Sequence, residues 1–475
     1  MINLTEQSNS DVKILFTLEV TNEIQVQAAL VDKKNNKKTA SYQTDFHHSE
    51  IEKDNFKQIR IAVSQVYLTV LQEWTGMIQK WGTLTGVRPT KLLHLYMEEN
   101  VPMDIAREQL KKTYLITDEK IDLMEKIVAR QLQVVPDLYQ LQNEVSIYIG
   151  IPFCPTKCAY CTFPAYAING RQGSVVSFLG GLHYEMRKIG EWLRKNNVKI
   201  TTVYYGGGTP TSITAEEMDM LYEEMDRSFP HLENIREITV EAGRPDTITT
   251  EKLDVLKRWK IDRISINPQS YTQETLKAIG RHHTVEETID KFHLARDKGM
   301  NNINMDLIIG LPGEGVPELA HSLSETAKLL PESLTVHTLS FKRASEMTKN
   351  KEKYKVADRF EVEKMMKMSE IWTKEHHYSP YYLYRQKNIL GNLENVGYAL
   401  QHQESIYNIM IMEERQTIIG LGCGAASKFI DSSGKITHFA NPKDPKTYNE
   451  SYEKYTAEKI NILNELFSPV ERPAR

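Results

Sequence analysis

The chain has few cysteines and no long apolar run. Only four of its 475 residues are cysteine, which excludes a disulfide-rich secreted domain and fits a reducing compartment. No stretch approaches the roughly 18 consecutive apolar residues of a membrane span, and Met1 to Asp11 lacks the basic-then-apolar order of a signal peptide. A net charge of −4 argues against a broad nucleic-acid surface. We therefore expect a cytoplasmic globular protein with no membrane span and no nucleic-acid partner.

The cysteines that are present are concentrated in one short stretch. Cys154, Cys158 and Cys161 have the spacing C-x₃-C-x₂-C, with the fourth cysteine, Cys423, far along the chain. A structural zinc site wants four ligands, and no His or further Cys is near. A disulfide would leave one thiol over. Three thiolates do suit a [4Fe–4S] cluster with one iron unligated by protein, which is a place for a substrate or cofactor to bind.

This loop, with Tyr160 before its last cysteine, resembles the radical S-adenosylmethionine (SAM) superfamily. The resemblance implies that Cys154, Cys158 and Cys161 hold the cluster, that SAM chelates the open iron, and that Tyr160 belongs to the cofactor-binding residues. It also implies a low-potential electron donor, such as a flavodoxin or ferredoxin. Reduction of the cluster would then cleave SAM to methionine and a 5′-deoxyadenosyl radical.

The first third of the chain carries no constellation of catalytic residues. Val12–Val20 and Ile24–Val31 alternate apolar and polar residues, which predicts a hairpin. Helical spacing follows from Ile51 to Trp81, and more helix is expected from Lys91 to Val134. We expect residues 1–143 to form an N-terminal α+β accessory domain, to which the sequence assigns no role.

From Val145 the pattern changes to short apolar strands that alternate with amphipathic helices. Six β-α repeats predict a parallel sheet with right-handed crossovers, so the fold class is α/β and residues 144–345 are expected to form a partial (β/α)₆ barrel. In such sheets, ligands bind at the carboxyl ends of the strands. The predicted strands are Val145–Ile151, Thr202–Tyr205, Glu237–Glu241, Arg263–Asn267, Asn302–Ile309 and Leu334–Leu339.

Polar or glycine-rich segments do follow strand after strand. The cysteine loop follows the first strand, and the second ends in Tyr-Gly-Gly-Gly-Thr-Pro-Thr, residues 205–211. This segment resembles the family's GGGTP element, which implies that Gly207, Gly208 and Thr209 bind the amino group of SAM.

Five further positions match, in order, the SAM contacts of the oxygen-independent coproporphyrinogen III oxidases and their relatives. The resemblance implies contacts to the ribose and carboxylate of SAM and to a second SAM molecule, so that one or two molecules bind. Each residue alone could equally form a structural salt bridge or cap. The five positions are Tyr148, Glu241, Gln269, Arg281 and Asp306.

Two longer segments sharpen the resemblance. Thr239–Asp246 and Tyr384–Tyr398 are similar to the HemZ type of coproporphyrinogen dehydrogenase. The implied activity is oxidative decarboxylation of coproporphyrinogen III to protoporphyrinogen IX without oxygen, in haem synthesis. The adenosyl radical would take a hydrogen from the β-carbon of a propionate, and loss of CO₂ and one electron would leave a vinyl group.

The sequence also departs from the family and leaves two rival functions. Phe163 stands where well-studied members carry a fourth cysteine, and Gly150 stands where they often carry histidine. The rivals are a haem chaperone, which binds haem without turnover, and a radical SAM enzyme that acts on haem itself. Fold and site do not by themselves fix a substrate.

Residues 346–475 are expected to form a substrate-capping region. Its aromatic segment Pro380–Arg385, with Arg385 and Lys387, would suit a flat macrocycle carrying propionates; aromatic packing over the barrel mouth is the other interpretation. Gly420–Ala425 resembles the G-x-G-x-x-A pattern of dinucleotide-binding sites, but the βαβ unit that such a site requires does not follow it. In the resembled family this segment lines the cofactor cavity, so Cys423 is expected to be a small buried residue.

The paired histidines show no second metal-ligand constellation. His282-His283 and His376-His377 are therefore expected to be polar neighbours of the site or of solvent.

Overall fold

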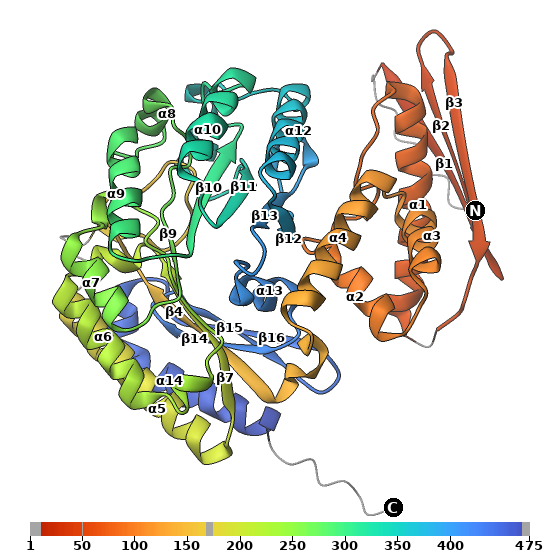
Figure 1. Ribbon diagram of the computed structural model, residues 1–475. Coiled ribbons are helices and arrows are strands. Elements are labelled where there is room, and N and C mark those ends of the chain that lie inside the picture. Colours follow the sequence, from red (N-terminus) through yellow and green to blue (C-terminus); the bar gives the residue numbers. More distant parts are fainter. Residues whose placement is uncertain (1–10, 50, 168–173, 468–475) are drawn as a thin grey trace, which may run out of the picture. The chain divides into compact units, whose positions relative to one another are not determined.

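A computed structural model describes residues 11–49, 51–167 and 174–467 and divides the chain into two compact units (Figure 1). Unit 1 is Met1–Lys126 and unit 2 is Ile127–Arg475. The first ten residues, on which the expectation about a signal peptide rests, lie outside the described residues. Among the described residues, no helix combines the length and the apolar character needed to cross a membrane.

Unit 1 joins a small antiparallel sheet to helices. The predicted hairpin forms as β1 (Val12–Val20) and β2 (Glu23–Asp32), and a third strand, β3 (Lys37–Asp45), pairs with β2. One face of β2 is buried at every second residue, which is the period of a half-buried strand. That face packs on α1 (Glu52–Thr75) through side chains that include Ile24, Val26, Ala62 and Val66.

The helical region predicted from Lys91 to Val134 forms three separate helices. These are α2 (Thr90–Glu98), α3 (Met103–Tyr114) and α4 (Asp118–Val134). Pro102 precedes α3 and cannot donate the hydrogen bond that a continuous helix needs there. Leu115, with a φ of 55°, ends α3 in the left-handed region.

Unit 2 is built on an 11-stranded sheet in the described part of the chain. All six predicted strands form and pair in parallel in their chain order. They are buried along most of their length, as expected for parallel strands covered on both faces. The strands are β4 (Glu144–Ile151), β7 (Lys199–Gly207), β8 (Glu237–Val240), β9 (Arg263–Ser265), β10 (Ile303–Ile309) and β11 (Ser333–Thr338).

Helices connect these strands along the outside of the sheet, as Figure 1 shows. Ser174, Thr214, Thr249 and Thr284 each cap one of them, because the side-chain oxygen accepts a backbone N–H of the first turn. The helices are α5 (Val175–Asn196), α6 (Ala215–Ser228), α7 (Thr250–Arg258), α8 (Gln273–Ala278), α9 (Val285–Asp297) and α10 (Val316–Leu329). The predicted partial barrel is therefore confirmed.

The last third of the chain extends the sheet at both edges. After α12 (Arg359–Glu375), the strands β12 (Ser379–Tyr384) and β13 (Asn395–Ala399) run antiparallel beside β11. On the other edge, β14 (Thr417–Gly422) runs parallel to β4, and β15 (Ala426–Ile430) and β16 (Ile436–Ala440) follow it. The domain limits 1–143, 144–345 and 346–475 and the capping role stay predictions.

Helix α13 (Ile406–Glu413) lies between these two extensions in the chain and packs on β12, β7 and β8. The buried carboxylate of Glu237 accepts the hydroxyl of Ser405 at 2.8 Å and the backbone N–H groups of Ile406 and Tyr407 at 2.7 and 3.1 Å. A carboxylate at a helix N-terminus is stabilising. This contact fixes α13 against the barrel strands.

A fully buried ion pair holds the C-terminal helix α14 (Pro445–Phe467) to the sheet. The ammonium of Lys459 contacts the carboxylate of Glu185 on α5, and both side chains are 0% exposed. Lys459 also donates to the carbonyl oxygen of Gly420 at 2.8 Å, and the backbone N–H of Gly422 donates to Glu185 at 2.6 Å. The pair therefore fixes the end of β14, where the glycine-rich segment begins.

We predict that Lys459→Met lowers the free energy of unfolding by about 3–5 kcal/mol, because Glu185 is left buried without its cation. Urea unfolding followed by tryptophan fluorescence measures the loss. Lys454→Met is the matched control on the same helix, since its side chain is 73% exposed and lies 3.9 Å from Glu458; it should change nothing measurable. Equal losses in the two variants would refute the structural role of the buried pair.

Candidate active site

One cavity of about 560 Å³ extends from the carboxyl ends of the parallel strands into the barrel. All twelve residues that the sequence nominates line it, although they come from six different segments of the chain. They are Tyr148, Cys154, Cys158, Tyr160, Cys161, Gly207, Gly208, Thr209, Glu241, Gln269, Arg281 and Asp306.

The cysteine loop is held in place by backbone contacts. It starts in β5 (Phe153–Cys154), which pairs with β6 (Tyr166–Ala167). The backbone N–H of Ala159 donates to the carbonyl of Ile279 at 3.0 Å, and the hydroxyl of Thr156 donates to the carbonyl of Gly280 at 3.1 Å. The three cysteines are half-buried free thiols. The loop therefore presents them to the cavity without a disulfide.

The donor set fits an iron–sulfur cluster. Among the described residues, no three His, Cys, Asp or Glu side chains converge as ligands of a single metal ion. In a cubane each cysteine binds a different iron, so thiols spread along a loop suit a cluster. Burial raises the pKa of Cys154 to about 11 and raises that of Cys161; both thiols therefore hold their protons until a metal displaces them.

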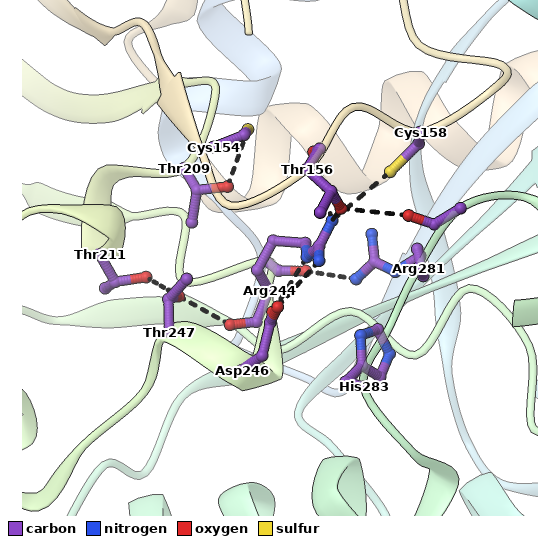
Figure 2. Close-up of polar contacts among 12 residues, drawn as sticks. Cys154, Thr156, Cys158, Thr209, Thr211, Arg244, Asp246, Thr247, Arg281 and His283 are labelled. Atoms are coloured by element: carbon purple, nitrogen blue, oxygen red, sulfur yellow. Dashed lines mark hydrogen bonds and ion pairs between the residues drawn. The ribbon is translucent and has the colours of Figure 1, made fainter. Parts of the chain in front are cut away.

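Arg244 lies directly behind the cluster loop (Figure 2). Its guanidinium donates to the hydroxyl of Thr156 at 3.0 Å and reaches the sulfur of Cys158 at 3.8 Å. Two further bonds, of 3.0 and 2.8 Å, run to the two carboxylate oxygens of Asp246, and Arg244 is 3% exposed. A fixed positive charge thus lies beside one of the three cysteines that the sequence nominates as cluster ligands. The sequence comparison included Arg244 in a matching segment but assigned it no role.

The glycine segment is shaped by its contact with the cysteine-bearing strand. The backbone N–H of Gly208 donates to the carbonyl of Ile151 and that of Thr209 to the carbonyl of Phe153, each at 2.7 Å. A Cβ on Gly208 would lie 2.5 Å from the carbonyl oxygen of Phe153, and Gly207 has a φ of +107°. Only glycine fits both positions. The approach also brings the hydroxyl of Thr209 within 3.2 Å of the sulfur of Cys154.

Two polar atoms in the cavity wall point to a polar ligand. The side-chain oxygen of Gln269 and Nε of Arg281 are buried without a hydrogen-bond partner among the described residues. Arg281 is positioned by its terminal nitrogen, which donates to the carbonyls of Gly243 and Asn267 at 2.7 and 2.8 Å. Buried polar groups are normally paired, so these atoms fit the role in binding SAM that the sequence implied.

The two carboxylates of the cavity have opposite pKa shifts. Burial raises the pKa of Glu241 to about 7, although the hydroxyl of Tyr204 donates to it. Burial also acts to raise the pKa of Asp306, but His337 at 3.4 Å and the amide of Asn304 at 2.8 Å outweigh it and hold the pKa below its usual value. Near pH 7 Asp306 is ionised, whereas Glu241 exchanges its proton.

Stacked tyrosines form the inner wall of the cavity. Tyr148 stacks on Tyr204 at 6.2 Å between ring centroids, and Tyr204 stacks on Tyr407 of α13 at 4.3 Å. Tyr382 and Tyr384 of β12 complete the aromatic lining. The sequence identified the aromatic segment of β12 and Tyr148, but it gave no signal that Tyr204 and Tyr407 meet.

The cations expected at the cavity from that segment are elsewhere. Arg385 and Lys387 do not line the cavity, and Arg385 donates instead to the side chain of Asn392 at 2.6 Å. Strand residues alternate between two faces, so Arg385 turns away where Tyr384 turns in. Among the cations that do line the cavity are Lys342, after β11, and Lys428, on β15.

The departures from the family have local explanations. A Cβ on Gly150 would lie 3.0 Å from the carbonyl oxygen of Cys423 and 3.3 Å from Cβ of Ala425, so the turn after β14 leaves no room for histidine there. Phe163 is 56% exposed at the rim of the cavity, with the ammonium of Lys342 at 5.6 Å from its ring centroid. No thiol stands at this rim position.

Of the remaining motifs, the glycine-rich segment reaches the cavity, as expected, through Cys423 and Gly424, and the histidines form no second metal site among the described residues. Gly420–Ala425 runs from β14 into β15 and opens no helix, so the rejection of a dinucleotide fingerprint is confirmed. Cys423 is buried, as expected, and donates to the carbonyl of Pro442 at 3.3 Å. His283 is buried beside Arg281 and Asp246 (Figure 2), where burial lowers its pKa to about 3. His376 stacks on Trp372.

Comparisons with known proteins agree with this geometry. The model of the radical SAM superfamily matches residues 148–325. The chain is 74% identical over 417 residues, 88% of its length and 83% of the relative's, to the oxygen-independent coproporphyrinogen-III oxidase-like protein HemZ of Bacillus subtilis. It is 26% identical to the heme chaperone HemW of Haemophilus influenzae over 68% of this chain and 81% of that protein.

A solved structure shows the same fold. Coproporphyrinogen III oxidase (HemN) from Escherichia coli superposes with a TM-score of 0.53 at 20% identity, over 68% of this chain and 72% of that one. The chain therefore belongs to the radical SAM superfamily, whose members use a [4Fe–4S] cluster and SAM. Within it, the chain belongs to the family of HemZ, the oxygen-independent coproporphyrinogen-III oxidase-like proteins.

We predict that Arg244→Gln makes the midpoint potential of the cluster more negative, because hydrogen bonds and positive charge near the ligating sulfurs favour the reduced state. Arg244→Lys keeps the positive charge but not the two-pronged set of N–H donors, so its midpoint potential should lie between those of the wild type and Arg244→Gln. Redox titration followed by electron paramagnetic resonance measures all three proteins at equal iron content. An unchanged potential in Arg244→Gln would contradict the assignment.

Proposed function

We propose that this protein decarboxylates coproporphyrinogen III oxidatively to protoporphyrinogen IX without oxygen. One observation carries the proposal: the cluster cysteines and the SAM-binding positions share a single cavity with a wall of tyrosines and two lysines. The name of the 74% identical relative supports it. The cluster and SAM, when bound, supply the radical that removes a hydrogen atom from a propionate side chain.

The chain's own residues bind and orient the substrate in this proposal. Tyr148, Tyr204 and Tyr407 offer a stacked aromatic surface to the pyrrole rings of the tetrapyrrole. Lys342 and Lys428 come from opposite halves of the sheet and provide charges for propionates. Lys428 already forms an ion pair with Glu414 at 2.8 Å, so Lys342 is the more available of the two ammonium groups for binding a propionate.

The two carboxylates of the cavity, Asp306 and Glu241, have different roles in this proposal. Asp306 is kept ionised by His337, whose Nδ1 lies 3.2 Å from the hydroxyl of Tyr384. This chain of contacts orients Asp306 toward a hydroxyl or ammonium donor of the cofactor. Glu241 holds or releases a proton near pH 7 at the carboxyl group that accepts the Tyr204 hydroxyl. Helix α13, which packs on β7, β8 and β12, supplies Tyr407 to the aromatic wall beside Glu241.

An anaerobic assay tests the proposal. Reconstituted protein, a chemical reductant, SAM and coproporphyrinogen III should give protoporphyrinogen, with 5′-deoxyadenosine formed in proportion to the vinyl groups, as read by mass spectrometry. Lys342→Met should raise KM for the porphyrinogen about tenfold, which is about 1.4 kcal/mol. Lys454→Met, exposed and outside the cavity, is its control.

Two results would overturn the proposal. Stoichiometric capture and transfer of haem without SAM cleavage would identify a chaperone, the function in the name of the HemW relatives. SAM cleavage that consumes haem and leaves coproporphyrinogen untouched would identify an enzyme acting on haem.

A further inference from the structure

The segment after β11 is strongly basic. Residues 342–355 contain six lysines and arginines against two glutamates, although the whole chain carries a net charge of −4. Five of the cations are exposed, and one of the glutamates, Glu346, accepts the hydroxyl of Tyr354 at 3.0 Å. The exposed cations are Arg343, Lys349, Lys351, Lys353 and Lys355.

This basic segment is packed directly onto the cluster loop. The backbone N–H of Met347, in the short helix α11 (Glu346–Lys349), donates to the carbonyl of Ala159 at 3.0 Å. The side chain of Met347 is 1% exposed and belongs to one apolar cluster with Ala159, and Tyr354 packs against the same cluster. Ser345 caps α11 through the N–H of Thr348. The hydrogen bond and the apolar packing of Met347 therefore hold the basic segment beside the cysteine loop.

The positive charge continues onto the loop itself. Lys157, between two cluster cysteines, is exposed, and Lys342 lies over the exposed ring of Phe163. Both ammonium groups are near enough to Cys161 to act on it electrostatically. The rim where the cluster loop meets solvent thus carries cations from two segments of the chain.

The position of this basic surface beside the cysteine loop distinguishes between its possible binding partners. A nucleic acid or a membrane has no reason to bind at a cluster loop, and a solvated face needs no apolar anchor such as Met347. The cluster must receive electrons from outside, because members of this superfamily need a reductant. Electron transfer falls steeply with distance, so the donor must approach this rim.

We infer that residues 343–355 and Lys157 form the docking surface for a small acidic one-electron carrier protein. The carrier loses one electron and the cluster gains it; no bond forms and no proton is transferred. Long-range attraction between the acidic carrier and the cationic rim raises the rate of productive encounter. The inference rests on the cluster site and is independent of which tetrapyrrole is the substrate.

The test uses the full-length reconstituted protein without SAM or porphyrinogen. A flavodoxin photoreduced to its hydroquinone is mixed with the protein at low ionic strength, and bleaching of the cluster absorbance is followed by stopped flow. The triple variant R343E/K349E/K353E should lower the second-order rate constant at least tenfold. None of these three side chains makes a hydrogen bond or ion pair with another described residue, so the iron content should not change.

Two controls isolate docking from other effects. K195E/K199E/K454E makes the same change in charge outside the rim, with Lys199 at the opposite, amino-terminal end of β7, and should leave the rate within twofold of the wild type. The methyl viologen radical needs no docking site and is itself a cation, so it should reduce both triple variants at least as fast as the wild type.

Three outcomes would overturn the inference. They are an unchanged rate with flavodoxin in R343E/K349E/K353E, an equal loss in the two triple variants, and a wild-type rate that does not fall as salt is added. The salt dependence decides the question even if the triple variant fails to hold its cluster. Since no porphyrinogen is present, a wrong substrate assignment leaves the result unaffected.

Discussion

The close approach of β7 to the cysteine-bearing strand is the contact on which the site depends. Gly208 binds the carbonyl of Ile151 at 2.7 Å, and a side chain there would collide with Phe153. The same approach sets Thr209 beside Cys154 and leaves the cluster loop between β4 and the barrel mouth. Because the strands are parallel, every residue that follows a strand then meets this loop at one edge of the sheet.

The rest of unit 2 closes the cavity around that edge. Its last third adds β14 beside β4 and β13 beside β11, and Glu237 fixes α13 across the barrel. The buried Glu185–Lys459 pair fixes the end of β14, whose following residues line the cavity. Three contacts set the charges in the cavity. The guanidinium of Arg244 lies 3.8 Å from the sulfur of Cys158, and His337 keeps Asp306 ionised. Burial raises the pKa of Glu241 to about 7.

The barrel and its site were predictable because their signals are local. Each strand is a short apolar run followed directly by a polar or glycine-rich segment, so Glu241 and Gln269 could be assigned to one edge before any contact was known. Asp306 lies within its strand and was added by the family resemblance. The added strands β12 to β16 were not predicted, since they are short, β12 to β14 contain Gly or Pro, and all five become strands only through long-range pairing. The same limit explains why Arg385 was one of two open interpretations at the cavity and Arg244 was given no role: side-chain direction depends on the register of partners far along the chain.

We propose that Cys154, Cys158 and Cys161 hold a cluster whose fourth iron is open to SAM. Electron–nuclear double resonance of the reduced protein with SAM labelled at the amino nitrogen tests this directly. We expect a hyperfine coupling between the cluster and that nitrogen, retained in Cys423→Ala and lost, together with the cluster, in Cys158→Ala. A cluster that forms without Cys158, or one that shows no coupling to bound SAM, would contradict it.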